Sequence, residues 1–134
     1  MKRMTIHLAR WGALALLIAL SACGTVARPD VASDIETAGN TVHMNNNRFV
    51  PEATTIAVGE SLTLVADTFA PHVIANGTWA GNSPQPGIEP GAPTVNDLRI
   101  DGNGSGTIGP FPEAGSFQFY CPIHPGMNLT VTVE

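Results

Sequence analysis

Beyond residue 22 the sequence contains no lysine, and only three arginines stand against eleven acidic residues. This part of the chain therefore carries a formal charge of −8. Such a charge argues against nucleic acid as a partner, because the phosphate backbone is bound through basic side chains. A negative field attracts basic surfaces instead and raises encounter rates in a salt-dependent way. We therefore expect protein partners with a basic docking surface.

The sequence also lacks the short motifs of common hydrolases. It has neither a Gly-x-Ser-x-Gly nucleophile elbow nor a His-Glu-x-x-His pair. Beyond residue 22 no segment keeps a helical period of apolar residues. We therefore expect neither a hydrolase of these classes nor a helical core.

Residues 1–22 have the layout of a secretory signal peptide. Basic residues precede an apolar run, Trp11–Leu20, which is followed by small residues. The apolar run is too short to span a bilayer comfortably, which argues against a retained transmembrane helix. We therefore set this segment apart from the folded protein.

The run Leu20-Ser21-Ala22-Cys23 resembles the bacterial lipoprotein processing box at all four positions. It predicts that Cys23 is lipidated and becomes the first mature residue. The protein would then be held at the extracytoplasmic face of a bacterial membrane, on the periplasmic or the outer cell-surface side. The alternative is ordinary signal cleavage nearby, which would leave Cys23 free.

Residues 23–41 show no sustained apolar period, and we expect a flexible tether after the lipidated cysteine. A flexible linker of this length has an r.m.s. reach of about 20–25 Å, so a folded domain could lie just clear of the membrane. Residues 42–134 are enough for one small domain with a single core.

Short runs rich in β-branched and aromatic residues, bounded by turn residues, predict an all-β sandwich or barrel of seven to eight strands. Gly59-Glu60 separates two of these runs and resembles a hairpin turn. The segment 81–93 carries four prolines and three glycines, which predicts a surface loop without regular structure. The expected strands lie within 42–50, 54–58, 61–66, 71–79, 97–100, 106–108, 116–120 and 128–133.

Cys121, His124 and Met127 place a thiol, an imidazole and a thioether within seven residues, in a loop that contains two prolines. Soft sulfur ligands beside imidazole suit copper, and two histidines, one cysteine and a weak axial methionine form blue-copper sites. A second histidine would have to come from upstream. Zinc is the chemical alternative, although structural zinc sites use cysteine and histidine rather than methionine.

Each candidate ligand also has an ordinary structural role open to it. Cys121 could be a small buried apolar residue and Met127 a core residue, and the histidines could be loop residues. However, an exported thiol without a disulfide partner is at risk of oxidation unless something such as a metal occupies it. His43, beside Met44, is expected to be a solvent-facing or edge residue rather than a ligand.

His72 lies in a Pro-His pair 49 residues before Cys121 and completes the pattern. With it the chain resembles the plastocyanin/azurin-type cupredoxins, and its Cys-x-x-His-x-x-Met loop is similar to the short loop of amicyanins. The resemblance spans residues 42–134. It implies a cupredoxin-like Greek-key β-sandwich and one type 1 copper ion, with His72, Cys121, His124 and Met127 as the metal ligands.

The resemblance also implies a function. We expect an exported, membrane-tethered blue copper protein, a monomer and not an enzyme, that carries single electrons between redox partners. The alternative is an extracytoplasmic copper-binding carrier or copper-resistance protein, which would hand over the metal instead of the electron. The pair His43-Met44 is faintly similar to motifs of periplasmic copper chaperones, but the further methionines of that pattern are missing.

The sequence departs from the family pattern at two positions. The family usually has asparagine after the first histidine, and here Val73 stands there. Its backbone N–H can still approach the Cys121 sulfur, so we expect an intact site with a less firmly latched loop. Amicyanin loops have proline two residues after the cysteine, whereas Ile123 keeps an N–H that we expect to donate to the thiolate and favour Cu(I).

The family resemblance further implies that the ring edge of His124 reaches the surface as the electron port, inside an apolar patch. Candidates for the patch are Ala70, Pro71, Pro122, Ile123 and Pro125. Patches of this kind make the small, transient contacts that suit redox partners.

Overall fold

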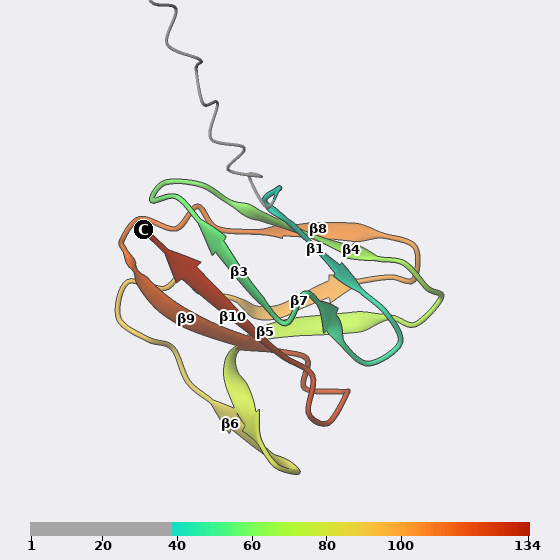
Figure 1. Cartoon of the computed structure of the whole chain (residues 1–134). Coiled ribbons are helices and arrows are strands. Elements are labelled where there is room, and N and C mark those ends of the chain that lie inside the picture. The colour runs from blue at the N-terminus through green and yellow to red at the C-terminus, as the bar shows by residue number, and fades with distance from the viewer. Residues whose placement is uncertain (1–38) are drawn as a thin grey trace, which may run out of the picture. The chain divides into compact units, whose positions relative to one another are not determined.

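The computed structural model describes residues 39–134. The predicted signal peptide, the lipidated Cys23 and nearly all of the expected tether lie outside the described residues. Between residues 39 and 134 the chain forms ten β-strands and no helix, and so none that could cross a membrane (Figure 1). The predicted all-β fold is confirmed.

One sheet has four strands in the order β2-β1-β4-β8. Strands β1 and β4 run parallel, whereas the β1–β2 and β4–β8 pairs are antiparallel. A turn closed by the Asn45 side chain, which accepts hydrogen bonds from the backbone N–H groups of Asn47 and Arg48, separates β1 from β2. The strands are β1 (Thr41–Met44), β2 (Phe49–Val50), β4 (Leu62–Ala66) and β8 (Ser105–Ile108).

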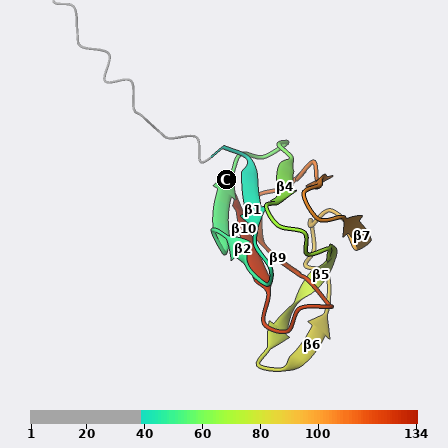
Figure 2. The same ribbon diagram turned by 90° about the vertical axis from the view of Figure 1, so that its right-hand side faces the viewer.

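The other sheet has six strands in the order β3-β10-β9-β5-β6, with β7 also paired to β5. Its central strands β9 and β10 are joined by the segment that carries Cys121, His124 and Met127. Figures 1 and 2 both show the β5–β6 hairpin extending beyond the rest of the sandwich. The strands are β3 (Ala53–Ile56), β5 (His72–Ala80), β6 (Ser83–Pro86), β7 (Asn96–Ile100), β9 (Gly115–Tyr120) and β10 (Asn128–Val133).

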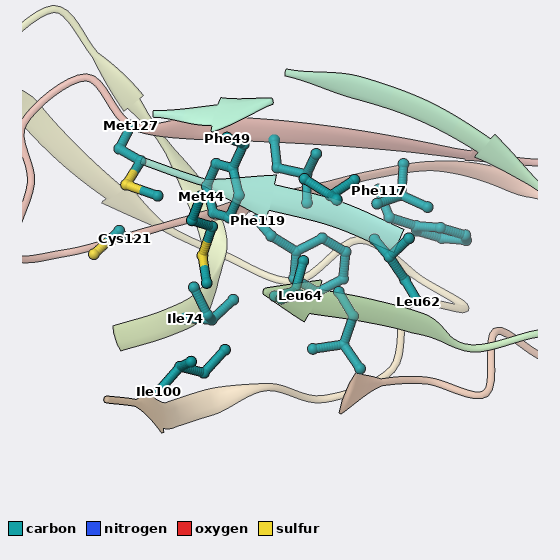
Figure 3. Packing of buried hydrophobic residues seen from close by; sticks show 14 of the residues in the cluster. Met44, Phe49, Leu62, Leu64, Ile74, Ile100, Phe117, Phe119, Cys121 and Met127 are labelled. Atoms are coloured by element: carbon teal, nitrogen blue, oxygen red, sulfur yellow. The ribbon is translucent and has the colours of Figure 1, made fainter. Parts of the chain in front are cut away.

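The core forms because apolar residues alternate along the strands and point to one face. In β10 every second residue is buried, as the period of two in a half-buried strand requires. Phe111 lies on the loop before β9, and its ring packs at 5.8 Å from that of Phe117 and 5.9 Å from that of Phe119. Burial of each such side chain contributes about 1.5–3 kcal/mol. Figure 3 shows this cluster, with Cys121 and Met127 together at one end of it.

The prediction of a hairpin at Gly59-Glu60 is wrong. Strand β3 pairs with β10 in one sheet, and β4 pairs with β1 and β8 in the other, so this connection crosses between the sheets. Its backbone N–H groups donate to segments outside β3 and β4: the N–H of Val58 to the carbonyl of Glu134, and the N–H of Gly59 to the carbonyl of Phe111. Turn residues thus mark a change of direction without specifying which strands pair.

The prediction that residues 81–93 lack regular structure is also partly wrong, because β6 lies within this segment. Strand β6 pairs with β5 and carries prolines at positions 84 and 86. The N–H of Gly87, the residue after Pro86, donates to the carbonyl of Asn76 on β5. Because successive residues of a strand point their N–H groups to opposite sides, the backbone nitrogens of Pro84 and Pro86 face away from β5. An edge strand tolerates proline at such positions, since no hydrogen bond to the neighbouring strand is lost. This strand, and the division of residues 42–50 into β1 and β2, raise the count from eight to ten.

Candidate metal centre

Two consecutive turns build the loop between β9 and β10. In the first, the N–H of His124 donates to the carbonyl of Cys121 over 3.1 Å; in the second, the N–H of Met127 donates to the carbonyl of His124 over 3.1 Å. Each turn has proline at its second position, as type I and type II turns favour, and Gly126 has the positive φ, 80°, that a type II turn needs at its third. The N–H of Cys121 donates to the carbonyl of Met127 over 3.0 Å and closes the loop. Cys121, His124 and Met127 therefore occupy the first and last positions of these two turns.

The first residue of β5 brings the missing histidine to this loop. The donor atoms of His72, Cys121 and His124 all lie within 4.8 Å of one another. The Cys121 sulfur is 3.3 Å from Nδ1 of His124, and the two imidazole rings are 5.0 Å apart between centroids. Cys121 and His72 are buried, while His124 is only partly covered. Residues 49 positions apart in the sequence thus form one compact donor set.

His72 is buried with its polar atoms unused. Only 1% of its surface is exposed, and neither ring nitrogen has a hydrogen-bond partner. Burial lowers the pKa of His72 below its ordinary value, and the nearby His124 ring lowers it further. The nearby main chain of Asn45 raises the pKa of His72, but it forms no hydrogen bond with either ring nitrogen. A neutral imidazole with a free lone pair, aimed at a thiol, is what a metal ligand requires.

Met127, the fourth residue of the predicted set, is completely buried at the end of the second turn. Figure 3 shows its sulfur at the same end of the core as that of Cys121. A thiol, two imidazoles and an adjacent thioether are the donor types of a blue-copper site. The residues present therefore fit a copper ion.

The backbone N–H of Val73 donates to the Cys121 sulfur over 3.5 Å. The predicted approach of this group to the sulfur is confirmed. The expected hydrogen bond from Ile123 is absent: within residues 39–134 no hydrogen bond joins its N–H to the sulfur. The first turn holds the Cys121 carbonyl, not its sulfur, and leaves the Ile123 side chain 52% exposed. Val73, rather than Ile123, donates to the thiol.

The loop is latched to β5 by residues that the sequence analysis did not single out. The indole N–H of Trp79 donates to the Cys121 carbonyl over 3.0 Å. The Asn128 side chain accepts from the backbone N–H of Trp79 at 2.7 Å and donates to its carbonyl at 3.1 Å. In the sequence Trp79 was simply a bulky strand residue and Asn128 began another strand, so no local signal marked either one.

His43 and Met44 lie on opposite faces of β1. His43 is exposed and its Nδ1 is 2.8 Å from a carboxylate oxygen of Asp67, whereas Met44 is fully buried. His43 is not part of the donor cluster. The expectation of a solvent-facing histidine is confirmed, although β1 is an inner strand that pairs with both β2 and β4. The two side chains do not converge on a shared site.

Apolar side chains lie exposed on the segments that carry the donors. Ile123 and Pro125 belong to the ligand loop, and Pro71 directly precedes His72. Phe69, which the sequence analysis did not include, is 91% exposed three residues before His72. Among the described residues it is the most exposed of the large apolar residues. We call Phe69, Pro71, Ile123 and Pro125 the apolar patch.

A groove of about 710 Å³ begins at Pro122 and Ile123 and follows β5. Its other walls come from the end of β6 and from residues 94–99. The Asn76 side chain, bonded to the Pro93 carbonyl and the Val95 N–H, fastens this segment to β5. Segment 81–93 thus contributes Pro86, Gly87 and Ile88 to a groove that also contacts the ligand loop.

The unpartnered His72 predicts a pH-dependent stability for the metal-free protein. Because its pKa is lowered in the folded state, the unfolded chain binds more protons below about pH 6.5. The free energy of unfolding should therefore fall as pH drops below about 6.5, by at most about 1.4 kcal/mol per pH unit from this group. Urea unfolding with a chelator, from pH 7.5 to 5.5, measures the slope. His72→Leu should flatten it, and equal slopes in both proteins would contradict the assignment.

Comparison with solved structures identifies the same architecture in two groups of proteins. Amicyanin from Paracoccus versutus is 22% identical, with a TM-score of 0.53, over 70% of this chain and 79% of that one. A mutant plastocyanin of fern, solved in oxidized and reduced states, is 22% identical over 70% of this chain and 99% of that one, again with a TM-score of 0.53. A reduced amicyanin mutant matches with 18% identity and the same TM-score.

No protein-family model matches the chain, and no curated protein matches it either. These three solved structures are each less than 25% identical to this chain and therefore speak for the fold alone. The described domain has the β-sandwich fold of amicyanin and plastocyanin, as the resemblance in the sequence implied.

Proposed function

We propose that this chain is a mononuclear type 1 copper protein that carries single electrons between redox partners outside the cytoplasm. One observation carries the proposal: a fully buried histidine, with both ring nitrogens unpartnered, faces a buried thiol and a second histidine. A buried polar group without a partner costs about 1–3 kcal/mol, so a metal ligand role explains why the group is there.

The residues divide the work of such a site. Cys121 would supply the thiolate, His72 and His124 the imidazoles, and Met127 the weak axial sulfur. Copper, when bound, accepts and releases one electron between Cu(II) and Cu(I). The two proline turns fix the positions of the loop donors and lower the entropy of ordering them. Ligands that move little between the two oxidation states favour fast electron transfer.

Export and membrane attachment are part of the proposal and rest on the sequence. The signal layout of residues 1–22 and the processing box ending at Cys23 support them. Mass spectrometry of the protein extracted from membranes tests the lipid. Cys23→Ser should release the protein into the soluble extracytoplasmic fraction, and continued membrane attachment would contradict the anchor.

Addition of Cu(II) to the purified metal-free protein tests the function. An intense visible charge-transfer band together with reversible voltammetry supports electron transfer. Colourless capture of Cu(I), with rapid release to chelators, supports the alternative of a copper carrier or resistance protein. The opposite orientation of His43 and Met44 argues against that alternative, because the pair does not form a second transfer site.

We expect partners to dock on the apolar patch around His124, which is only partly covered. The described domain has arginines at 48 and 99 and eight acidic residues, so its surface is acidic. Association with a basic redox partner should therefore slow as the salt concentration rises. Rates that do not change with salt for any partner would contradict this steering.

Substitution in the apolar patch should slow electron self-exchange between two copies of the copper protein. Phe69→Ser and Ile123→Ser each remove an exposed apolar contact from the patch, and we expect a decrease of roughly fivefold to tenfold, equivalent to about 1 kcal/mol. Line broadening in mixtures of reduced and oxidised protein measures the rate.

Val58→Ser is the matched control, because Val58 is similarly exposed, at 48%, and lies on the β3–β4 connection away from the donors. Since both copies are acidic, self-exchange should also accelerate as salt rises. Equal slowing by all three substitutions would argue against docking at the patch.

A further inference from the structure

Pairing between β5 and β9 ends just before the ligand loop. The register contains only Ala75 opposite Tyr120 and Asn76 opposite Phe119. In this antiparallel pair the next residues of β5 toward the loop are Ile74 and Val73, which pair with β7 and are not in register with β9. On the side away from the loop, β5 pairs with β6 from Gly77 onward. Regular sheet pairing with β5 therefore stops one residue short of Cys121, and other contacts must fix the loop against this strand.

Trp79 supplies such a contact through the backbone of the thiol residue. Its indole N–H and the N–H of His124 both donate to the Cys121 carbonyl, over 3.0 and 3.1 Å. A carbonyl oxygen has two lone pairs, so these two bonds use its full capacity. One bond closes the first turn and the other joins that turn to β5. Together they fix the plane of the peptide that follows the thiol residue.

Asn128 fixes Trp79 in turn. Its side-chain amide pairs with both backbone groups of Trp79, as a strand residue would. Asn128 directly follows Met127, so β5 is fastened to both ends of the Cys121–Met127 loop. The Tyr120 ring packs edge-on against the indole, with 6.1 Å between centroids. A Cβ at Gly77 would lie 2.9 Å from that tyrosine ring, so glycine allows the close approach.

Resting on the copper function proposed above, we propose that Trp79 is a positioning residue of the metal centre. Its indole N–H holds the Cys121 carbonyl, and thereby sets the direction in which the thiol points toward the Val73 N–H and His72. This latch stands in for the asparagine that the family resemblance led us to expect at position 73. The loop is therefore firmly latched, from a residue seven positions after His72.

The test compares Trp79→Phe, which keeps an aromatic ring and loses the N–H, with Tyr120→Phe as the matched control. Tyr120→Phe removes one hydroxyl from the ring beside Trp79 and leaves the loop hydrogen bonds intact. In the metal-free protein, amide hydrogen exchange at His124 and Met127 should become roughly threefold to tenfold faster in Trp79→Phe, as the loss of one hydrogen bond predicts. Exchange at Val131 and Val133 in β10 should not change.

In the copper-loaded protein, Trp79→Phe should change the relative intensity of the charge-transfer bands and the reduction potential, and Tyr120→Phe should change neither. Asn128→Ala is a second route to the same result, since it frees the backbone of Trp79. Loop exchange unchanged in Trp79→Phe, or raised equally in β10, overturns the proposal. If the wild type binds no copper, the proposed function fails, and the exchange comparison still decides the latch.

Discussion

Replacing Cys121 by serine is expected to abolish the intense visible band of the copper-loaded protein. The band requires charge transfer from a thiolate, and a hydroxyl oxygen does not supply it. The remaining imidazoles can still hold a metal, but the affinity should fall by more than the roughly 10–100-fold that the loss of an outer partner costs. Absorption spectra and competition with a chelator of known affinity measure both effects.

Cys23→Ser is the matched control for this experiment, because it removes the other cysteine of the chain and leaves the donor cluster intact. Its visible band should equal that of the wild type. A band that survives in Cys121→Ser would place the thiolate elsewhere and refute the assignment of the site. Loss of the band in Cys23→Ser would have the same consequence.

Copper should stabilise the folded protein by about 4 kcal/mol when its free concentration is a thousand times the dissociation constant. For a domain of this size each 1 kcal/mol raises the melting temperature by about 4–8 °C, so the expected rise is about 15–30 °C. The physical reason is that the donors of His72, Cys121 and His124 converge within 4.8 Å only in the folded chain. Calorimetric melts with copper and with a chelator measure the difference.

His72→Leu separates the two roles of the buried imidazole in this experiment. The variant should lose most of the stabilisation by copper, because one donor is gone. Without metal it should be more stable than the wild type by about 1–3 kcal/mol, because a buried polar group without a partner has been removed. A variant that is less stable without metal would show that His72 contributes to the apo fold and would weaken the ligand assignment.

Much of the fold could be predicted from the sequence, because alternation of apolar residues and turn residues are local signals. Strand pairing is not local, and this is why the Gly59-Glu60 connection was misread: the turn is real, but the flanking strands belong to different sheets. Strand β6 was missed because Pro84 and Pro86 are strand breakers in general, and only their alternate spacing on an edge makes them acceptable.

The clustering of His72, Cys121 and His124 could be predicted, because Cys121 and His124 are close in the sequence and the family resemblance pointed to His72. The hydrogen-bonding environment could not. Ile123 has a free N–H in the sequence, but the direction of that group depends on the turn geometry. Trp79 reaches Cys121 across 42 residues through a side-chain bond that leaves no pattern in the sequence. Long-range polar contacts of this kind require the structure.

The prolines of β6 have a consequence for how the protein behaves when crowded. An exposed sheet edge normally offers a row of N–H and C=O groups to which a strand from another molecule can add, and this is a common start of aggregation. On β6 the outward positions are Pro84 and Pro86, which have no N–H to offer. The projecting hairpin is therefore protected from edge-to-edge association, and the same protection would apply at the high local concentration that the proposed membrane anchor implies.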